Sequence, residues 1–229
     1  YRTAMNTHLA SWSSKPLDSI TRDMVERKHR SLSEYSASAA NKAMRILRAV
    51  FNYAEGKYED EQGRSLFPEN PVKRLTHTKS WNRETRRQNV IKSSELRSWL
   101  GAVNGLRESS DSFEQVAGDY FLFLLLTGLR RREGSSLLIE DVDFAERAFT
   151  IWATKNRKPI TLPMSSQVEA LLKGRCGERV SGPIFPGPED DKPINDPRRC
   201  IQKVRAVSAI EFTLHDLRRT FITIAESLD

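Results

Sequence analysis

The strongest constraint on the fold is a run of seven apolar residues, Tyr120 to Leu126, which is followed by Thr127-Gly128. Together with the residues from Phe113 onward, this run predicts a buried helix that ends at Gly128. Glycine is favoured there because it adopts the left-handed conformation that often closes a helix. A membrane-spanning helix needs roughly 18 apolar residues. The run is far shorter, so the sequence predicts a globular core and excludes a membrane span or a membrane partner.

Positive charge is concentrated in the first part of the chain. The net charge is +7, but residues 1–92 carry 18 Lys and Arg against 10 Asp and Glu, whereas residues 93–229 carry 19 against 20. A basic segment of this kind favours a polyanionic partner such as nucleic acid, although many basic faces are only solvated.

Residues 1–75 are expected to form a helical domain. The clearest helix spans residues 36–55, because its apolar residues recur at steps of three and four. An earlier helix is predicted from about Thr21, and residues 56–71 are predicted to form a loop. Three cations lie off the apolar stripe of the helix over residues 36–55 and could face either phosphates or water: Lys42, Arg45 and Arg48.

Residues 76–92 lack helical periodicity and are predicted to form a basic linker that runs along DNA. Within this stretch Glu84 is the one acidic residue. The cations that are expected to contact DNA are Lys79, Arg83, Arg86 and Arg87.

Residues 93–229 are predicted to form a second domain that is mostly helical. Helices are expected from Ser94, over 113–127, and near 165–173, 196–207 and 213–228. Short β-type runs at 142–151 and 159–162 flank a basic tip, which predicts a small antiparallel sheet with a hairpin. The expected fold class is therefore mainly α with a small antiparallel β-sheet.

Two arginine-rich segments carry the functional signal: Thr127-Gly128-Leu129-Arg130-Arg131-Arg132-Glu133 and His215-Asp216-Leu217-Arg218-Arg219-Thr220. The second follows Thr213, and the T-x-x-D pattern of residues 213–216 predicts a capped helix start. Together the two segments resemble the arginine boxes of the tyrosine recombinases, the phage-integrase family. The resemblance implies a helical core-binding domain followed by a catalytic domain, the two clamping opposite sides of a DNA duplex.

The resemblance also implies roles for individual side chains. Arg130 and Arg218 would hold the non-bridging oxygens of one DNA phosphate, and Glu133 would orient Arg130 or a neighbouring group. His215 would assist by hydrogen bonding or proton transfer. Lys155 resembles the hairpin lysine that protonates the leaving 5′ oxygen, with Lys158 as a competitor and Arg157 a more distant one.

The family's nucleophile is a tyrosine downstream of the second arginine box, and it forms a 3′-phosphotyrosyl link. All tyrosines of this sequence precede both boxes: Tyr1, Tyr35, Tyr53, Tyr58 and Tyr120. The chain is therefore expected to bind DNA without cleaving it, as a piece that stops before the nucleophile. In a full-length parent the expected activity is site-specific DNA integration and recombination. The alternatives are a non-cleaving DNA-binding module and a type IB topoisomerase.

Neither a cofactor nor a metal is expected. No Walker-type phosphate-binding motif is present, and no His, Cys or acidic cluster has metal-ligand spacing. The phosphotyrosyl link conserves the ester, so the reaction needs no ATP. The expected partners are double-stranded DNA and further copies of the parent protein in a synaptic tetramer. The expected location is the cytoplasm, in a bacterial or phage-encoded, DNA-associated protein.

Overall fold

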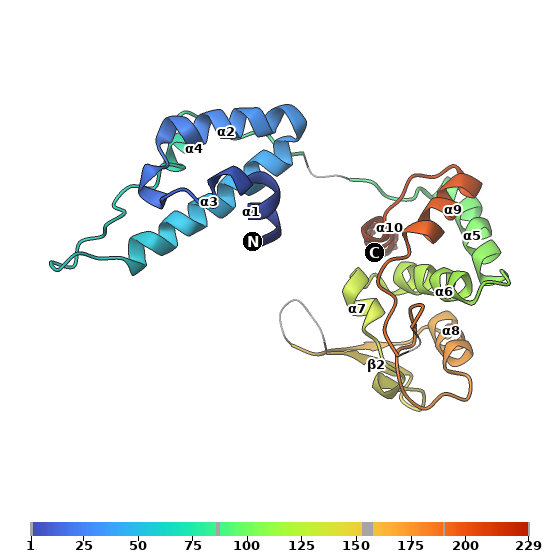
Figure 1. Ribbon diagram of the computed structural model, residues 1–229. Helices are drawn as coiled ribbons and strands as arrows, with labels where there is room; N and C mark the ends of the chain where they lie inside the picture. Colours follow the sequence, from blue (N-terminus) through green and yellow to red (C-terminus); the bar gives the residue numbers. More distant parts are fainter. Residues whose placement is uncertain (1, 86–87, 153–157, 190, 229) are drawn as a thin grey trace. The chain divides into compact units, whose positions relative to one another are not determined.

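The computed structural model describes residues 2–85, 88–152, 158–189 and 191–228 (Figure 1). The chain divides into two compact units, Tyr1–Arg86 and Arg87–Asp229, and each is described by itself. Both units are largely helical, and the second also holds a three-stranded antiparallel sheet. The predicted fold class, mainly α with a small antiparallel sheet, is confirmed.

The first unit contains four α-helices among its described residues. They are α1 (Arg2–His8), α2 (Arg22–Tyr35), α3 (Ala37–Lys57) and α4 (Lys73–His77), with short 3-10 turns at Ala10–Trp12 and Leu17–Ser19. Thr21 and Ser36 start α2 and α3, since each hydroxyl accepts a backbone N–H three residues on. The apolar stripe of α3 forms the core of this unit, with Met44, Leu47 and Phe51 buried.

The stretch predicted as a linker, residues 76–92, contributes side chains to the cores of both units. Trp81 packs against the core of the first unit, and Ile91 is buried in the core of the second. The described residues between Ser80 and Lys92 form neither helix nor strand. The division between the units falls at Arg86 and Arg87, inside the predicted linker.

The second unit is built around the buried helix α6 (Ser112–Thr127). Helices α5 (Ser93–Arg107), α8 (Ser166–Cys176), α9 (Arg198–Ser208) and α10 (Leu214–Glu226) pack against it, and the short α7 (Arg131–Ser135) follows it directly. Asp111 caps α6 by accepting the backbone N–H groups of Phe113 and Glu114. The buried helix predicted from the apolar run is therefore confirmed. Within the described ranges, no helix is long and apolar enough to cross a membrane.

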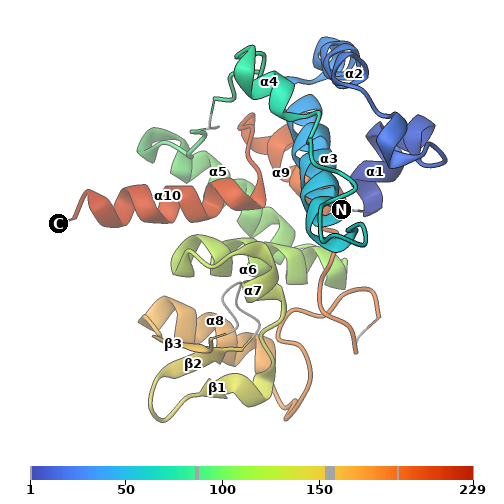
Figure 2. The ribbon, with the colours of Figure 1, turned by 90° about the vertical axis from the view of Figure 1, so that its left-hand side faces the viewer.

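The sheet has the strand order β1-β2-β3, with β1 at Val142–Asp143, β2 at Ala148–Ile151 and β3 at Ile160–Pro163 (Figure 2). Phe149 pairs with Val142 on one side and with Leu162 on the other, and Ile151 pairs with Ile160. Phe149 and Ile151 are buried, and the Phe149 ring lies 5.6 Å from the Phe123 ring of α6. The sheet therefore packs on the central helix through alternate residues of β2.

Candidate active site

The first arginine box begins at the turn that ends α6. Gly128 adopts a φ of +64°, and its N–H donates to the Leu124 carbonyl to close the helix. A Cβ at this position would lie 2.3 Å from Cδ1 of Phe221 in α10. Gly128 is thus required twice, for its left-handed backbone and for the close approach of α10. This turn brings the first arginine box against the helix that carries the second.

Arg130 and Glu133 form the next part of the site. Arg130 immediately precedes α7, and its backbone N–H donates to Oε2 of Glu133 at 2.9 Å. Its Nη1 donates to Oε1 of the same carboxylate at 2.7 Å. The Glu133 side chain is only 6% exposed, whereas that of Arg130 is 50% exposed. The buried carboxylate therefore fixes one edge of the guanidinium and leaves the rest accessible to a ligand.

The electrostatics of Glu133 connect both arginine boxes. Burial raises the pKa of this carboxyl, but hydrogen bonds from the Arg130 side chain and backbone oppose it, as do the positive charges of Arg130 and Arg218. The pKa is lowered on balance, so Glu133 is ionised at neutral pH. The Glu133 carboxylate thus interacts electrostatically with both Arg130 and Arg218, although 88 residues separate the two arginines.

Arg218 is held on α10 and points to the turn after α6. Its Nη1 donates to the backbone carbonyl of Gly128. The helix begins as the T-x-x-D pattern predicts, because the Thr213 N–H and hydroxyl donate to the buried Asp216 carboxylate at 2.9 and 2.7 Å. That carboxylate also accepts Nη1 of Arg219 at 2.7 Å. Capping and the Gly128 contact together set the direction of the Arg218 side chain.

Thr220 fixes the rotation of α10 about its own axis. Its hydroxyl is buried, donates to the Asp216 carbonyl at 2.8 Å, and accepts the Ile91 N–H at 2.9 Å. This bond ties the helix to the first residues of the second unit. The threonine of the second box thus has a structural role that no sequence pattern indicated.

The structure brings Arg130, Glu133 and Arg218 together at the turn after α6. His215 lies one helical turn before Arg218 on the same face of α10 and is exposed, and within the described ranges it makes no hydrogen bond or ion pair. Its imidazole is therefore available to a ligand beside the arginines. Lys155 lies outside the described residues. Chemically, two guanidinium groups beside an accessible imidazole form a site for an anion with several oxygens.

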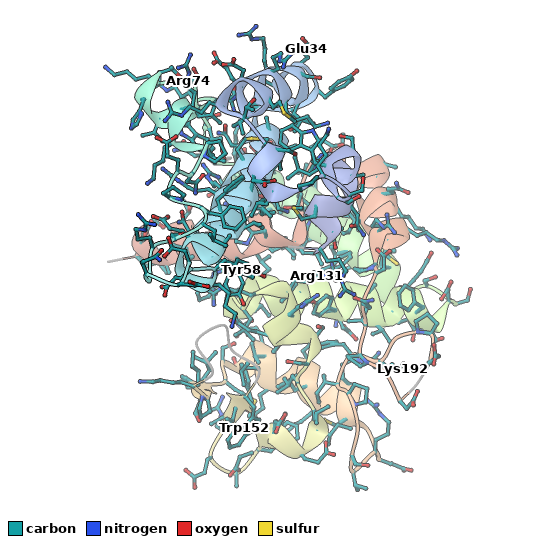
Figure 3. All side chains as sticks on the ribbon, turned by 60° about the vertical axis from the view of Figure 1, so that its left-hand side comes forward. Glu34, Tyr58, Arg74, Arg131, Trp152 and Lys192 are labelled. Carbon is teal, nitrogen blue, oxygen red and sulfur yellow. The ribbon has the colours of Figure 1, made fainter. Side chains whose placement is uncertain are left out.

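Trp152 directly follows β2, at the base of the β-hairpin (Figure 3). Its side chain is exposed, and its Nε1 donates to Oδ1 of Asp141 at 2.9 Å. The Thr150 and Thr161 hydroxyls bond across the two strands at 2.9 Å. These contacts join β2 and β3 near the end of the described part of the hairpin.

Of the cations that were predicted to bind DNA, Lys42, Lys79 and Arg83 are exposed. Lys79 has a φ of +53°, an uncommon left-handed conformation for a lysine. Arg86 and Arg87 lie outside the described residues.

The other two predicted DNA-binding cations, Arg45 and Arg48, have partners within the first unit. Arg45 pairs with Glu84 at 3.0 Å, and Arg48 donates to the Thr76 hydroxyl at 3.3 Å. The guanidinium carbons of both lie over the ring of Trp81, which the sequence did not single out.

Tyr120 is the tyrosine nearest in sequence to the first box, and its environment does not suit a nucleophile. It is fully buried, and its hydroxyl donates to the backbone carbonyl of Arg131, a residue labelled in Figure 3. Burial raises the pKa of this phenol. The phenol is therefore neutral and committed to a structural bond.

Comparison with known proteins decides the family. The family model described as the phage integrase family matches residues 89–225, which is more than half of the chain. The chain belongs to the phage integrase family. This confirms the resemblance read from the two arginine boxes.

Two curated members of this family resemble the chain over most of its length. Prophage integrase IntF of Escherichia coli K12 is 26% identical over 226 residues, which cover 95% of this chain and 46% of the relative. A putative integrase/recombinase of Haemophilus influenzae is 25% identical over 161 residues, which cover 70% of this chain and 43% of that protein. The chain thus spans less than half the length of these relatives.

Solved structures show the same fold. The XerH site-specific recombinase bound to its palindromic difH substrate matches with a TM-score of 0.73 and 17% identity, covering 95% of this chain and 65% of that one. The Tn1549 transposon integrase in complex with circular intermediate DNA matches with a TM-score of 0.72 and 18% identity, covering 99% of this chain and 78% of that one. A lambda integrase tetramer bound to a Holliday junction matches with a TM-score of 0.71 and 17% identity, covering 99% of this chain and 63% of that one.

Proposed function

We propose that this chain is the DNA-binding and phosphate-activating part of a site-specific tyrosine recombinase acting on double-stranded DNA. The observation that carries the proposal is the meeting of Arg130, Glu133 and Arg218 at the turn after α6. Two arginines from separate elements, one held by a buried carboxylate and one by a backbone carbonyl, suit a single phosphodiester.

The proposed chemistry uses these groups to stabilise a five-coordinate phosphorus. Negative charge grows on the non-bridging oxygens, and Arg130 and Arg218 oppose it there. His215 hydrogen-bonds an oxygen or transfers a proton, and Lys155 protonates the leaving 5′ oxygen. The attacking tyrosine becomes esterified to the 3′ phosphate as the 5′ oxygen leaves. The 5′ hydroxyl of a partner strand then attacks this phosphotyrosyl bond, which rejoins the DNA and releases the tyrosine. The phosphotyrosyl ester retains the bond energy, so no ATP enters the scheme.

The attacking tyrosine is proposed to come from outside residues 1–229. No tyrosine follows Arg218 in this sequence. The buried, hydrogen-bonded Tyr120 supports the proposal, because its phenol is neither accessible nor free to ionise.

DNA binding is proposed to rest on the first 92 residues. In this scheme residues 1–75 are a core-binding domain, residues 76–92 a basic linker, and residues 93–229 the catalytic domain. The exposed cations described above support this division of labour. The proposed phosphate contacts are Lys42, Arg45, Arg48, Lys79, Arg83, Arg86 and Arg87.

The parent protein is further proposed to act as a synaptic tetramer, by analogy with the lambda integrase tetramer on a Holliday junction. Its proposed location is the cytoplasm of a bacterium, on phage or chromosomal DNA. The XerH and Tn1549 proteins, which were solved with DNA, support DNA as the partner.

The experiment that tests the proposal is a titration of residues 1–229 into labelled duplex DNA at several salt concentrations. The logarithm of the association constant should fall linearly with the logarithm of salt, with a slope of about −0.9 for each phosphate neutralised. Substituting Arg83 by glutamate should weaken binding to unrelated duplexes equally. Absence of binding at low salt, or binding that salt leaves unchanged, contradicts the proposal.

A further inference from the structure

A polar clasp fastens residues 81–84 to helices α2 and α3; we define it as His29, Ser33, Asn41 and Asn82. The Asn82 N–H donates to Oδ1 of the buried Asn41 at 3.1 Å, and Nδ2 of Asn41 donates back to the Asn82 carbonyl at 2.9 Å. The Asn82 side chain donates to the Ser33 hydroxyl at 2.8 Å, and Nε2 of His29 lies 3.0 Å from Oδ1 of Asn41. Buried and satisfied networks of this kind specify one conformation of the chain.

The clasp sets the position of Trp81, the residue just before Asn82. Its Nε1 donates to the Thr76 hydroxyl at 3.0 Å, and its ring and the His29 ring are T-shaped with centroids 5.9 Å apart. The guanidinium carbons of Arg45 and Arg48 each lie 5.9 Å from the centroid of the same indole. One aromatic ring thus holds two cations that are three residues apart on α3.

Bringing two positively charged side chains to one indole costs electrostatic free energy, which the ring offsets. Two guanidinium groups held close together repel each other, whereas the face of tryptophan attracts a cation within about 6 Å. Glu84 neutralises part of the charge, because its carboxylate pairs with Arg45 and accepts Nδ2 of Asn41. The Arg45 side chain nevertheless remains 60% exposed. Its unused donors therefore face solvent.

We propose that Trp81 is a positioning residue for DNA binding. Held by the polar clasp, its indole keeps the Arg45 and Arg48 guanidinium groups together on α3 as a preformed site for backbone phosphates of a duplex. Preorganisation reduces the side-chain entropy that two long arginines lose when they bind. The inference rests on the proposed function, because it assumes that the chain binds duplex DNA.

The test compares Trp81→Leu with Trp81→Phe in the 229-residue chain. Neither substitution changes the net charge, and only the phenylalanine retains an aromatic face. Affinity for a labelled duplex of fixed sequence is measured by fluorescence anisotropy over a salt series, and thermal unfolding reports on the fold. Trp81→Leu should weaken binding roughly fivefold or more, because two long arginine side chains would then lose their freedom on binding. Trp81→Phe should stay close to wild type.

A double-mutant cycle separates positioning from other effects of Trp81. In a chain that carries Arg45→Gln and Arg48→Gln, Trp81→Leu should cause no further loss of affinity, because there is nothing left to position. An equal loss in both backgrounds, or no loss in either, overturns the inference while leaving DNA binding intact. Failure of the wild-type chain to bind the duplex at low salt overturns the proposed function as well.

A second measurement keeps the fold unchanged should Trp81→Leu unfold the first unit. Fluorinated tryptophan, incorporated in place of the natural residue, weakens the attraction of the ring for cations with little change in shape. Affinity for the duplex should fall as fluorine atoms are added. The same labelling of the Trp81→Phe chain should have no effect. If the labelled wild-type chain binds as tightly as the unlabelled one, the indole does not position the arginines.

Discussion

Arg218 donates a hydrogen bond from its guanidinium to the backbone carbonyl of Gly128, 90 residues earlier in the chain. The bond joins the second arginine box to the turn that begins the first. Arg130 lies two residues after Gly128, so a single backbone turn determines the relative position of both arginines. The geometry of the proposed site therefore depends on the packing of α10 against the end of α6.

Gly128→Ala should disturb this turn. The new Cβ would lie 2.3 Å from Phe221 Cδ1, at a backbone φ of +64°. We expect a loss of about 1–3 kcal/mol in the free energy of unfolding, measured by urea denaturation. Gly101→Ala in α5 is the matched control, since a Cβ there meets open space. In a helix this change should stabilise by about 0.5–1 kcal/mol. Equal effects at both positions would contradict the role assigned to Gly128.

Thr220→Val should destabilise the second unit with little change in side-chain shape. The valine cannot accept the Ile91 N–H, which is then left without its partner. We expect a loss of about 1–3 kcal/mol in the free energy of unfolding. Thr223→Val, an exposed position on the same helix, should change stability by less than about 0.5 kcal/mol. Amide hydrogen exchange at Ile91 should also become faster in Thr220→Val, and unchanged exchange would argue against this bond.

Glu133→Gln should make stability depend less on pH. The pKa of Glu133 is lowered in the folded protein from an ordinary value of 4.5. Its ionised form therefore contributes stability that is present above about pH 4.5 and is lost as the pH falls through the folded pKa. The free energy of unfolding of Glu133→Gln should be about 1 kcal/mol below that of the wild type at neutral pH, and this deficit should shrink in acid.

Urea denaturation at neutral and acidic pH measures this deficit. The exposed Glu146, substituted in the same way, is the control and should show a smaller change at both values. A Glu133→Gln deficit that grows in acid would contradict the sign of the shift.

The helices of both units were predictable because their apolar residues follow the helical period and their caps are local. Thr21 and Thr213 each precede a helix, as the sequence indicated, and the helix predicted over residues 36–55 starts just after Ser36. The short helices α4 and α7 were not predicted, since five residues carry too little periodicity for a pattern to emerge.

The site was predictable only in part. The two arginine boxes singled out Arg130 and Arg218 as candidate phosphate ligands and Glu133 as a carboxylate near Arg130. The contacts that hold them are long-range, as between Arg218 and the Gly128 carbonyl or between Thr220 and Ile91. A backbone carbonyl carries no residue-specific signal in a sequence. Trp81 escaped notice for a similar reason, because its cations come from a helix more than 30 residues earlier.

Residues 1–229 alone should form no covalent link to DNA. Two arginines stabilise a transition state but supply no attacking oxygen, and Tyr120 is buried with its hydroxyl bonded to the Arg131 carbonyl. A nicked suicide duplex incubated with the chain should therefore give no adduct on a denaturing gel. A longer parent that includes a downstream tyrosine should give one. An adduct mapped to a tyrosine within residues 1–229 would show that the nucleophile is misassigned.

The central claim is that Arg130 and Arg218 bind one and the same phosphate. The most direct test is the salt dependence of duplex binding for Arg130→Gln, Arg218→Gln and the double variant, with the exposed Arg132→Gln as the control. The double variant should reduce the slope of log affinity against log salt by about 1 in total, because only one phosphate is lost, and neither single variant should reduce it by more than that. A double variant whose slope falls by about 2, or a double variant that matches Arg132→Gln, would contradict the account.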